Sequence, residues 1–188
     1  MIAARGLAKR YGDTRVFSDV DLDLPDGGFL LVTGANGSGK TTLLRVLAGL
    51  AAPTAGEVTL PTRRAIGYLG HEPLVYRELT PLETLTLFAR LYRVERERVG
   101  MLLERFGLWD VRDRRVSTFS RGMQQRLGLC RVLLHEPALL VLDEPTNALD
   151  AQGLDLLESV LDEQRTFVLA THEPQRVEQR ATTRLAFP

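Results

Sequence analysis

Residues 34–42 have the types and spacing of a phosphate-binding loop. The run Gly-Ala-Asn-Gly-Ser-Gly-Lys-Thr begins at Gly34 and ends with Lys40 and Thr41. Glycines let the backbone curl so that successive N–H groups face phosphate oxygens, and the start of a following helix adds partial positive charge. In such a loop the lysine reaches the β- and γ-phosphates and the hydroxyl binds Mg²⁺. We expect ATP and Mg²⁺ as ligands.

The alternative for this segment is a chance glycine turn. A short apolar run at residues 29–33 predicts a buried strand before the loop, and residues 40–50 predict a helix after it. That strand–loop–helix context is the one a phosphate-binding loop requires. The nucleotide-binding residues predicted here are Gly34, Ala35, Asn36, Gly37, Ser38, Gly39, Lys40, Thr41 and Thr42.

Two adjacent acids follow a second apolar run, at residues 138–142. A buried parallel strand delivers such residues to the carboxyl edge of its sheet, where ligands of α/β sheets bind. There Asp143 would hold Mg²⁺ through water, and Glu144 would serve as general base for an attacking water. A plain strand end with solvated acids is the alternative. The phosphate-binding loop upstream favours the chemical interpretation.

The segment Phe119–Arg126 resembles the signature motif of ABC ATPases. Ser120 is expected to cap the helix that follows. In the family, the hydroxyl of this serine and the N–H of the glycine at position 122 bind the γ-phosphate of an ATP held by the other subunit. Arg121 stands where glycine is usual, and Met123 stands where glutamine is usual. Taken alone, the segment would indicate only an ordinary capped helix.

The ABC resemblance covers essentially the whole chain and implies further site residues. Tyr11 would stack on adenine with Val16 beside it, although a half-exposed surface tyrosine is the alternative. The loop that ends at Asp150 would connect the two subunits, and Asp150 would also cap the next helix. His172 would contact the γ-phosphate.

His71 departs from the family pattern, which has glutamine at this Mg²⁺-sensing position. We assign it as a third metal ligand, after Thr41 and Asp143. Each of the three histidines precedes Glu-Pro, which invites a metal-cluster interpretation. Their contexts differ and their spacing is not that of metal ligands, so we do not expect a cluster.

The elements that must position these residues alternate between strand and helix, which indicates an α/β fold. The resemblance implies a P-loop NTPase of the ABC type, with a mostly parallel sheet, an antiparallel edge sheet and an inserted helical subdomain. We expect one domain over residues 1–188. Residues 1–71 and 136–188 would form its P-loop part, and residues 72–135 its helical part with the signature motif.

The composition of the chain limits the kinds of partner that we expect it to bind. The chain carries 24 basic and 24 acidic residues, so nothing indicates nucleic acid. No apolar run approaches the length of a membrane helix, and the N-terminus has no signal-peptide pattern. The resemblance implies a homodimer over two MgATP, bound peripherally at the cytoplasmic face of the membrane to an integral membrane subunit on another chain.

The chain resembles the ATPase of the cytochrome c maturation haem exporter (CcmA type) in three features. These are His71 in place of glutamine, the short length of the chain, and the sequence Ser-Arg-Gly-Met-Gln in the signature segment. The same signature sequence also occurs in small multidrug exporters. A soluble ABC ATPase of DNA repair or translation, and a non-hydrolysing nucleotide-binding module, are further alternatives.

Overall fold

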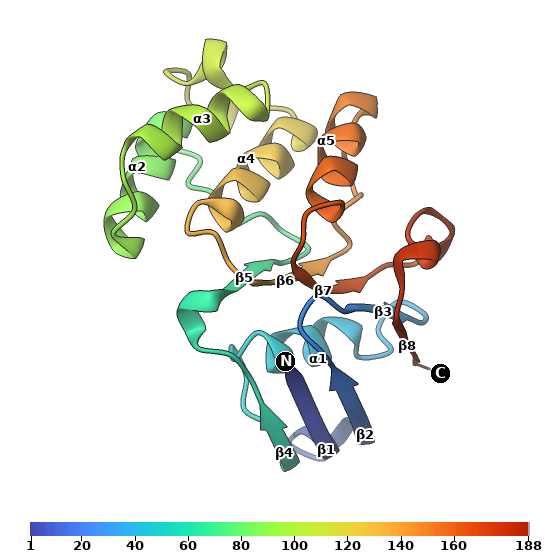
Figure 1. The fold of residues 1–188 in the computed structure, drawn as a ribbon. Helices are drawn as coiled ribbons and strands as arrows, with labels where there is room; N and C mark the ends of the chain where they lie inside the picture. Colours follow the sequence, from blue (N-terminus) through green and yellow to red (C-terminus); the bar gives the residue numbers. More distant parts are fainter. Residues whose placement is uncertain (188) are drawn as a thin grey trace. The chain divides into compact units, whose positions relative to one another are not determined.

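The structure, a computed structural model, describes residues 1–187 and groups the chain into two compact units. The first unit holds residues 1–68 and 138–144 and the chain from residue 164 onward. The second unit holds residues 69–137 and 145–163. Figure 1 shows the elements of each unit.

The first unit contains two sheets. A three-stranded sheet has the order β2-β1-β4, and a five-stranded sheet has the order β5-β6-β7-β3-β8. The first is antiparallel, and β3 pairs in parallel with both β7 and β8 in the second. The expected mostly parallel sheet with a separate antiparallel sheet is thus confirmed. The strands are β1 (Ile2–Tyr11), β2 (Thr14–Leu24), β3 (Phe29–Thr33), β4 (Ala55–Thr59), β5 (Ile66–Leu69), β6 (Leu139–Asp143), β7 (Thr166–Ala170) and β8 (Thr183–Ala186).

Helix α1 (Lys40–Leu47) contributes to the same core as both sheets. Its buried leucines, Leu43, Leu44 and Leu47, join apolar side chains of β1, β2, β3, β6 and β7. Strands β6 and β7 are buried at every position, as expected for parallel strands covered on both faces. The P-loop therefore connects a strand and a helix that both pack in this core.

The second unit is helical, with α2 (Pro81–Tyr92), α3 (Glu97–Arg105), α4 (Arg121–Leu133) and α5 (Ala151–Leu161). Helix α2 begins as its sequence predicts. Thr80 and Glu83 form a reciprocal capping box, and Pro81 occupies the first turn. In the described residues 1–187, no helix combines the length and apolar character that a membrane span requires.

Helix α5 belongs to the second unit, whereas residues 136–188 were expected in the P-loop part. Side-chain contacts account for this grouping. Arg105 on α3 donates to Ser159 Oγ at 3.2 Å and to Glu163 Oε1 at 2.7 Å, and Arg126 on α4 donates to Gln152 Oε1 at 3.3 Å. The division into subdomains itself stays a prediction.

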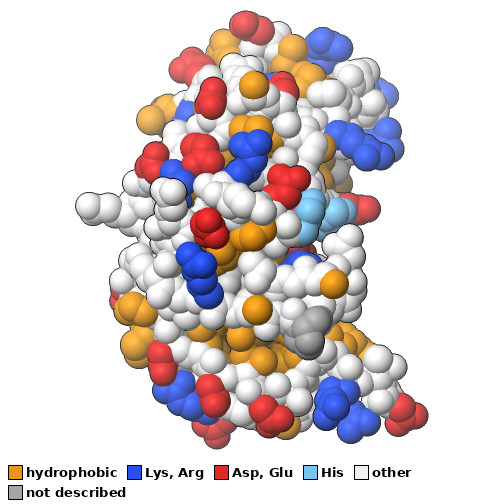
Figure 2. Space-filling model, turned by 90° about the vertical axis from the view of Figure 1, so that its right-hand side faces the viewer, with side chains coloured by type: hydrophobic (Ala, Val, Ile, Leu, Met, Phe, Trp, Pro, Cys, Tyr) orange, Lys and Arg blue, Asp and Glu red, His pale blue; other side chains and the backbone are white. Residues whose placement is uncertain are grey.

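Charges of both signs occur together on one face of the protein. Acidic and basic side chains alternate with uncharged ones on the face that Figure 2 presents. The mixture agrees with the equal numbers of basic and acidic residues in the chain.

Candidate functional site

The loop from Gly34 to Gly39 has a backbone that side chains would obstruct. Gly39 has φ +110°, and a Cβ there would lie 2.8 Å from Val16 Cγ1. Gly39 is also the N-cap of α1, and it supplies no side-chain hydrogen bond to the first turn of the helix. The N–H groups of that turn stay available to an anion at the helix start. Asn36 and Gly37 lie exposed in the loop, and Thr42 lies half-buried in the first turn of α1.

Lys40 is buried and holds its amine over this loop. Its Nζ donates to the Gly34 carbonyl at 2.8 Å and to the Ala35 carbonyl at 2.9 Å. An ammonium group has three N–H donors, so one is left for a further acceptor. The lysine is therefore fixed at the loop with donor capacity for a phosphate oxygen.

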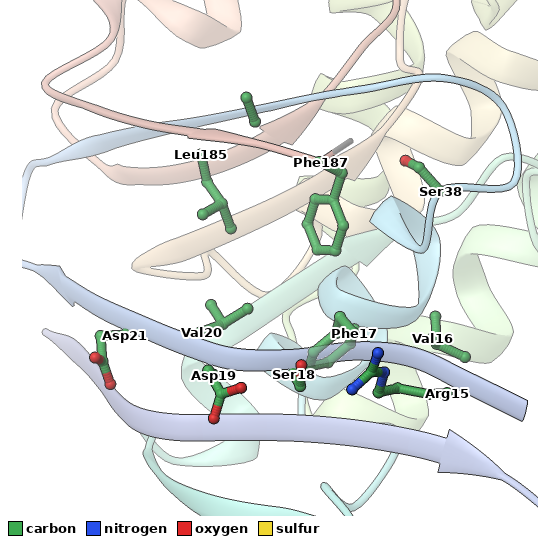
Figure 3. Close-up of a pocket in the computed structure, with 11 residues that line it drawn as sticks. Arg15, Val16, Phe17, Ser18, Asp19, Val20, Asp21, Ser38, Leu185 and Phe187 are labelled. Atoms are coloured by element: carbon green, nitrogen blue, oxygen red, sulfur yellow. The ribbon is translucent and has the colours of Figure 1, made fainter.

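A cavity of about 570 Å³ opens beside the loop, between β2 and β8. Phe187 and Leu185 point from the β8 side toward Phe17 and Val20 on β2, with Ser38 at one end (Figure 3). The Ser38 hydroxyl is buried and has no hydrogen-bond partner among residues 1–187. A buried hydroxyl without a partner is costly, so this side chain suits a polar ligand.

Thr41 and Asp143 are in direct contact. The Thr41 hydroxyl donates to Asp143 Oδ2 at 2.7 Å, which joins the first residue after Lys40 to the end of β6. A hydroxyl and a carboxylate are the hard oxygen ligands that Mg²⁺ prefers. The pair therefore fits the predicted metal, and these residues would hold it. Burial raises the pKa of Tyr68 on β5, and the negative charge of the Asp143 carboxylate raises it further.

Glu144 follows β6 in a strained conformation. It has φ +51°, a region that non-glycine residues rarely adopt. Its N–H donates to the Ala170 carbonyl at 2.9 Å, and its buried carboxylate accepts from His172 Nδ1 at 2.8 Å. Because β6 and β7 pair in parallel, both residues leave the same edge of the sheet. A carboxylate and an imidazole at that distance can accept and hold a proton.

The hairpin of β1 and β2 carries the predicted adenine residues. Val16 lines the cavity beside the P-loop, together with Ser38. Tyr11 ends β1 opposite Thr14, about half of its surface is exposed, and the Lys9 amine lies 4.8 Å from its ring centroid. Tyr11 does not line that cavity, so its stacking on adenine stays a prediction.

The remaining predicted nucleotide residues lie in the second unit. Ser120 caps α4 by accepting from the Met123 N–H at 3.2 Å, and Asp150 caps α5 by accepting from the Gly153 N–H at 2.8 Å. The structure shows both caps as expected. At Gly122, an added Cβ would lie 2.8 Å from the Ala148 carbonyl oxygen. The contacts of these residues with nucleotide stay predictions.

His71 lies in the second unit and lines a different cavity from the P-loop residues. Its assignment as a Mg²⁺ ligand stays a prediction. In the described part of the chain, no three or more His, Cys, Asp or Glu side chains are grouped as a metal site would need.

The arrangement of these motifs agrees with the comparison with protein families. The profile of the ABC transporter family matches residues 17–147, which include the P-loop, the signature segment and the strand that ends in Asp143. The chain belongs to the ABC transporter family. The resemblance identified from the motifs is confirmed.

Several curated ABC ATPases are similar to this chain. The uncharacterized ABC transporter ATP-binding protein YdbJ of Bacillus subtilis is 36% identical over 92% of the chain, which spans only 61% of that relative. The lantibiotic transport ATP-binding protein SrtF of Streptococcus pyogenes is 33% identical over 95% of the chain and 82% of the relative. The cytochrome c biogenesis ATP-binding export protein CcmA of Methylococcus capsulatus is 40% identical over 86% of the chain and 84% of the relative.

Two solved ABC structures share the fold. The ATP-binding subunit of an ABC transporter superposes with a TM-score of 0.90 at 27% identity, covering 99% of this chain and 85% of that one. The ATP-binding cassette MJ0796, in a dimeric post-hydrolysis state bound to ADP and phosphate, has a TM-score of 0.88 at 25% identity, covering all of this chain and 94% of that one. The chain therefore has the ABC ATPase fold.

Sequence reasoning missed two groups of residues. Phe17, Leu185 and Phe187 line the cavity beside the P-loop, and only their place in predicted strands could have suggested it. Arg126 is buried between the ends of several elements, where it donates to the Phe106 carbonyl at 3.2 Å and lies 3.9 Å from Asp150 Oδ2. The unusual burial of an arginine inside a helix is not visible in the sequence.

Proposed function

We propose that this ABC ATPase binds MgATP through its first unit, hydrolyses it to ADP and phosphate, and powers a membrane subunit on a separate chain. The observation that carries the proposal is the Glu144–His172 hydrogen bond at the sheet edge where Thr41 also meets Asp143. A nucleotide-binding module without hydrolysis would have no use for a strained, buried carboxylate held by histidine.

The residues divide the reaction between binding and proton transfer. The N–H groups at the start of α1 and the Lys40 amine bind the phosphates. Glu144 accepts the proton of the attacking water, while His172 holds the Glu144 carboxylate in place. Mg²⁺ bound by Thr41 and Asp143 would neutralise charge on the phosphates. Positioning and charge neutralisation supply most of the catalysis in such phosphoryl transfers.

Two copies of the chain are proposed to share each site. Ser120 and Gly122 of one copy would bind the γ-phosphate of ATP held by the P-loop of the other. The dimeric structure of the similar cassette MJ0796 with ADP and phosphate supports this arrangement. A second copy would then complete the site that one chain leaves half built.

Phosphate release from ATP tests the hydrolysis directly, with Lys40→Ala as the inactive control. We expect the wild-type chain to release phosphate well above this control. Equal, background release by both proteins, together with tight ATP binding by the wild type, would instead identify a non-hydrolysing module.

We propose haem export in cytochrome c biogenesis as the transport process that this ATPase powers. The CcmA relatives of Methylococcus capsulatus and Pseudomonas syringae support it, at 40% and 37% identity. The lantibiotic and daunorubicin relatives support a peptide or drug exporter as the competing candidate. Purifying the tagged chain from detergent extract tests both. Haem export predicts a membrane partner whose presence makes ATP turnover respond to haem.

The membrane setting is tested in the same preparation. We propose that the chain sits at the cytoplasmic face of the membrane through its partner. A partner recovered from detergent extract supports this placement. Recovery of the chain from cytosol with soluble partners alone would favour the soluble ABC ATPases of repair or translation.

A further inference from the structure

Both ends of the P-loop pack against one aromatic side chain, Phe187, which follows β8. A Cβ added at Gly34, the first residue of the loop, would lie 2.8 Å from Phe187 Cβ. A Cβ added at Gly39, the last residue before Lys40, would lie 3.5 Å from Cε1 of the same phenylalanine. The Phe187 side chain therefore lies beside the two glycines between which the loop runs, although it is distant from them in sequence.

The backbone of Phe187 is held in place by the parallel sheet. Strand β8 pairs with β3 so that Ala186 lies opposite Thr33, and the Phe187 N–H donates to the Thr33 carbonyl at 2.8 Å. Thr33 is the last residue of β3, and the P-loop begins directly after it. The position of Phe187 is thus fixed by its backbone, so a change of its side chain alters the contact with the loop and leaves this hydrogen bond in place.

A second aromatic side chain supports this ring from the antiparallel sheet. Phe17 on β2 is buried, and its ring meets that of Phe187 edge to face, with 6.0 Å between the centroids and 79° between the planes. Aromatic pairs favour this geometry. The neighbouring Val16 also packs on the loop, because its Cγ1 would lie 2.8 Å from a Cβ at Gly39. Figure 3 shows the two rings between β8 and β2, beside the loop that carries Ser38.

The loop between these two contacts has a backbone with few restraints of its own. Gly34, Gly37 and Gly39 all have positive φ, and a Cβ at Gly37 would meet no atom within 4 Å. Glycines of this kind allow the curled backbone but also allow many other conformations. A ligand that binds only one of these conformations binds more weakly in proportion to the fraction of time for which that conformation is absent. Packing at the two ends of the loop should therefore raise the affinity for phosphate groups.

We propose that Phe187 is a positioning residue for ATP, because its ring, supported by Phe17, holds both ends of the P-loop in the binding conformation before the nucleotide arrives. This inference rests on the proposed function, since it concerns the same nucleotide site. It assigns part of the ATP affinity to a side chain that acts through Gly34 and Gly39. Loss of binding that is equal in the ground state and the transition state raises KM and leaves kcat unchanged.

Two measurements on the full chain test the proposal: calorimetric titration with ATP in the absence of Mg²⁺, and steady-state phosphate release with MgATP. Both are made well below the melting temperature of each variant. We expect Phe187→Ala to weaken ATP binding and to raise KM by about ten-fold, with kcat within about two-fold of wild type. Phe187→Leu keeps apolar contact at Gly34 but removes the ring beside Gly39. It should therefore lie between wild type and Phe187→Ala, and it carries the test if Phe187→Ala does not fold.

Phe167→Leu is the matched control, since Phe167 on β7 forms another aromatic pair of the same unit, with 5.5 Å between its ring centroid and that of Phe29. This pair lies at the start of β3, whereas the P-loop follows the end of that strand. The control should leave ATP affinity and KM within about two-fold of wild type, even if it lowers stability more.

Wild-type affinity and KM in Phe187→Leu and Phe187→Ala would overturn the proposal. So would an equal rise of KM in Phe167→Leu, or a loss confined to kcat. Phosphate release by the wild type no higher than that of Lys40→Ala would instead contradict the proposed function, and the titration with ATP would still decide the role of Phe187.

Discussion

Glu144 combines three features that rarely coincide in one side chain. It is buried, its backbone has φ +51°, and its carboxylate is hydrogen-bonded to His172. Strain of this kind costs about 1–3 kcal/mol and persists only where the surroundings impose it. The pairing of β6 with β7 imposes it here, through the hydrogen bond from the Glu144 N–H to Ala170.

Glu144→Gln should keep ATP binding and lose about two to four decades of turnover, the range that removal of a general base usually costs. The amide keeps the size of the side chain and its capacity to bond His172. Glu136→Gln is the control, because Glu136 also has a positive φ, +51°, but pairs with Arg98 in the other unit. Turnover of Glu144→Gln within a few-fold of Glu136→Gln would show that another group is the base.

The thiol of Cys130 should make the stability of the protein depend on pH. The neighbouring Leu127 and Leu134 on the same side of the helix predict a buried cysteine, and Cys130 is buried. Burial raises the pKa of its thiol. Because the pKa of the thiol is higher in the folded than in the unfolded state, its contribution to the free energy of unfolding is fully present below the pKa of the unfolded thiol. That contribution is lost as the pH rises above this value. Above about pH 8.5 the free energy of unfolding should therefore fall by up to about 1.4 kcal/mol per pH unit more in wild type than in Cys130→Ala. Urea unfolding of both proteins at several pH values measures the difference, and parallel pH profiles would contradict it.

At the residue scale, the sequence predicts which positions should carry chemistry, but it predicts few of the contacts between their side chains. The link between Thr41 and Asp143 follows from two motifs that meet at one sheet edge. The bond between Glu144 and His172 follows only from the order β6-β7, because 28 residues separate the two side chains in sequence. Strand order is a long-range property that no local spacing encodes.

Helix α4 shows how an element positions two sets of residues at once. One face, with Gly128, lies against Pro73, and another, with Gly122, lies against the Ala148 carbonyl. Arg126, one turn beyond Gly122, reaches Gln152 and the Phe106 carbonyl. The helix is therefore wedged between the segment 71–77 and the loop before α5, and small residues are required at its contacts.

Gly122→Ala should destabilise the protein, although alanine is the better helix former. Its Cβ would lie 2.8 Å from a backbone oxygen, and such overpacking costs about 1–3 kcal/mol against about 1 kcal/mol gained in helix propensity. Gly100→Ala in α3 is the matched control, because its Cβ would meet only Trp109 at 3.6 Å. Chemical denaturation should rank Gly100→Ala at or above wild type and Gly122→Ala below it. Equal stabilisation by both would show that the contact with Ala148 is loose.

Element boundaries were predicted well where caps and periodicity agree. Thr80, Pro81 and Glu83 predicted the start of α2, and the structure begins α2 at Pro81. The sequence indicates a strand at residues 2–7, but β1 continues to Tyr11. Its register with β2 shifts between Ala4 and Leu7 around Gly6, which has φ +54°. The irregularity disturbs the side-chain alternation beyond Gly6, since a bulge shifts the period of side chains along a strand.

At the scale of the whole molecule, the predicted functional residues fall into two separate sets. The P-loop, Asp143, Glu144 and His172 belong to the first unit, and Ser120, Gly122 and Asp150 belong to the second. No single sequence motif states how the two sets combine. The proposed function has them combine between two copies of the chain, head to tail, over two ATP molecules.

Mixing two inactive variants tests this central claim most directly. Lys40→Ala removes the P-loop amine. Ser120→Asp keeps a good helix N-cap and would place a negative charge where the shared-site account puts the γ-phosphate. In a mixed dimer, one site loses both elements and the other stays intact. Phosphate release from the equimolar mixture should return to about a quarter of wild type, because random pairing makes half of the dimers mixed and each has one intact site. Release that stays at the level of the separate variants, with mixed dimers shown to form, would contradict the shared-site account.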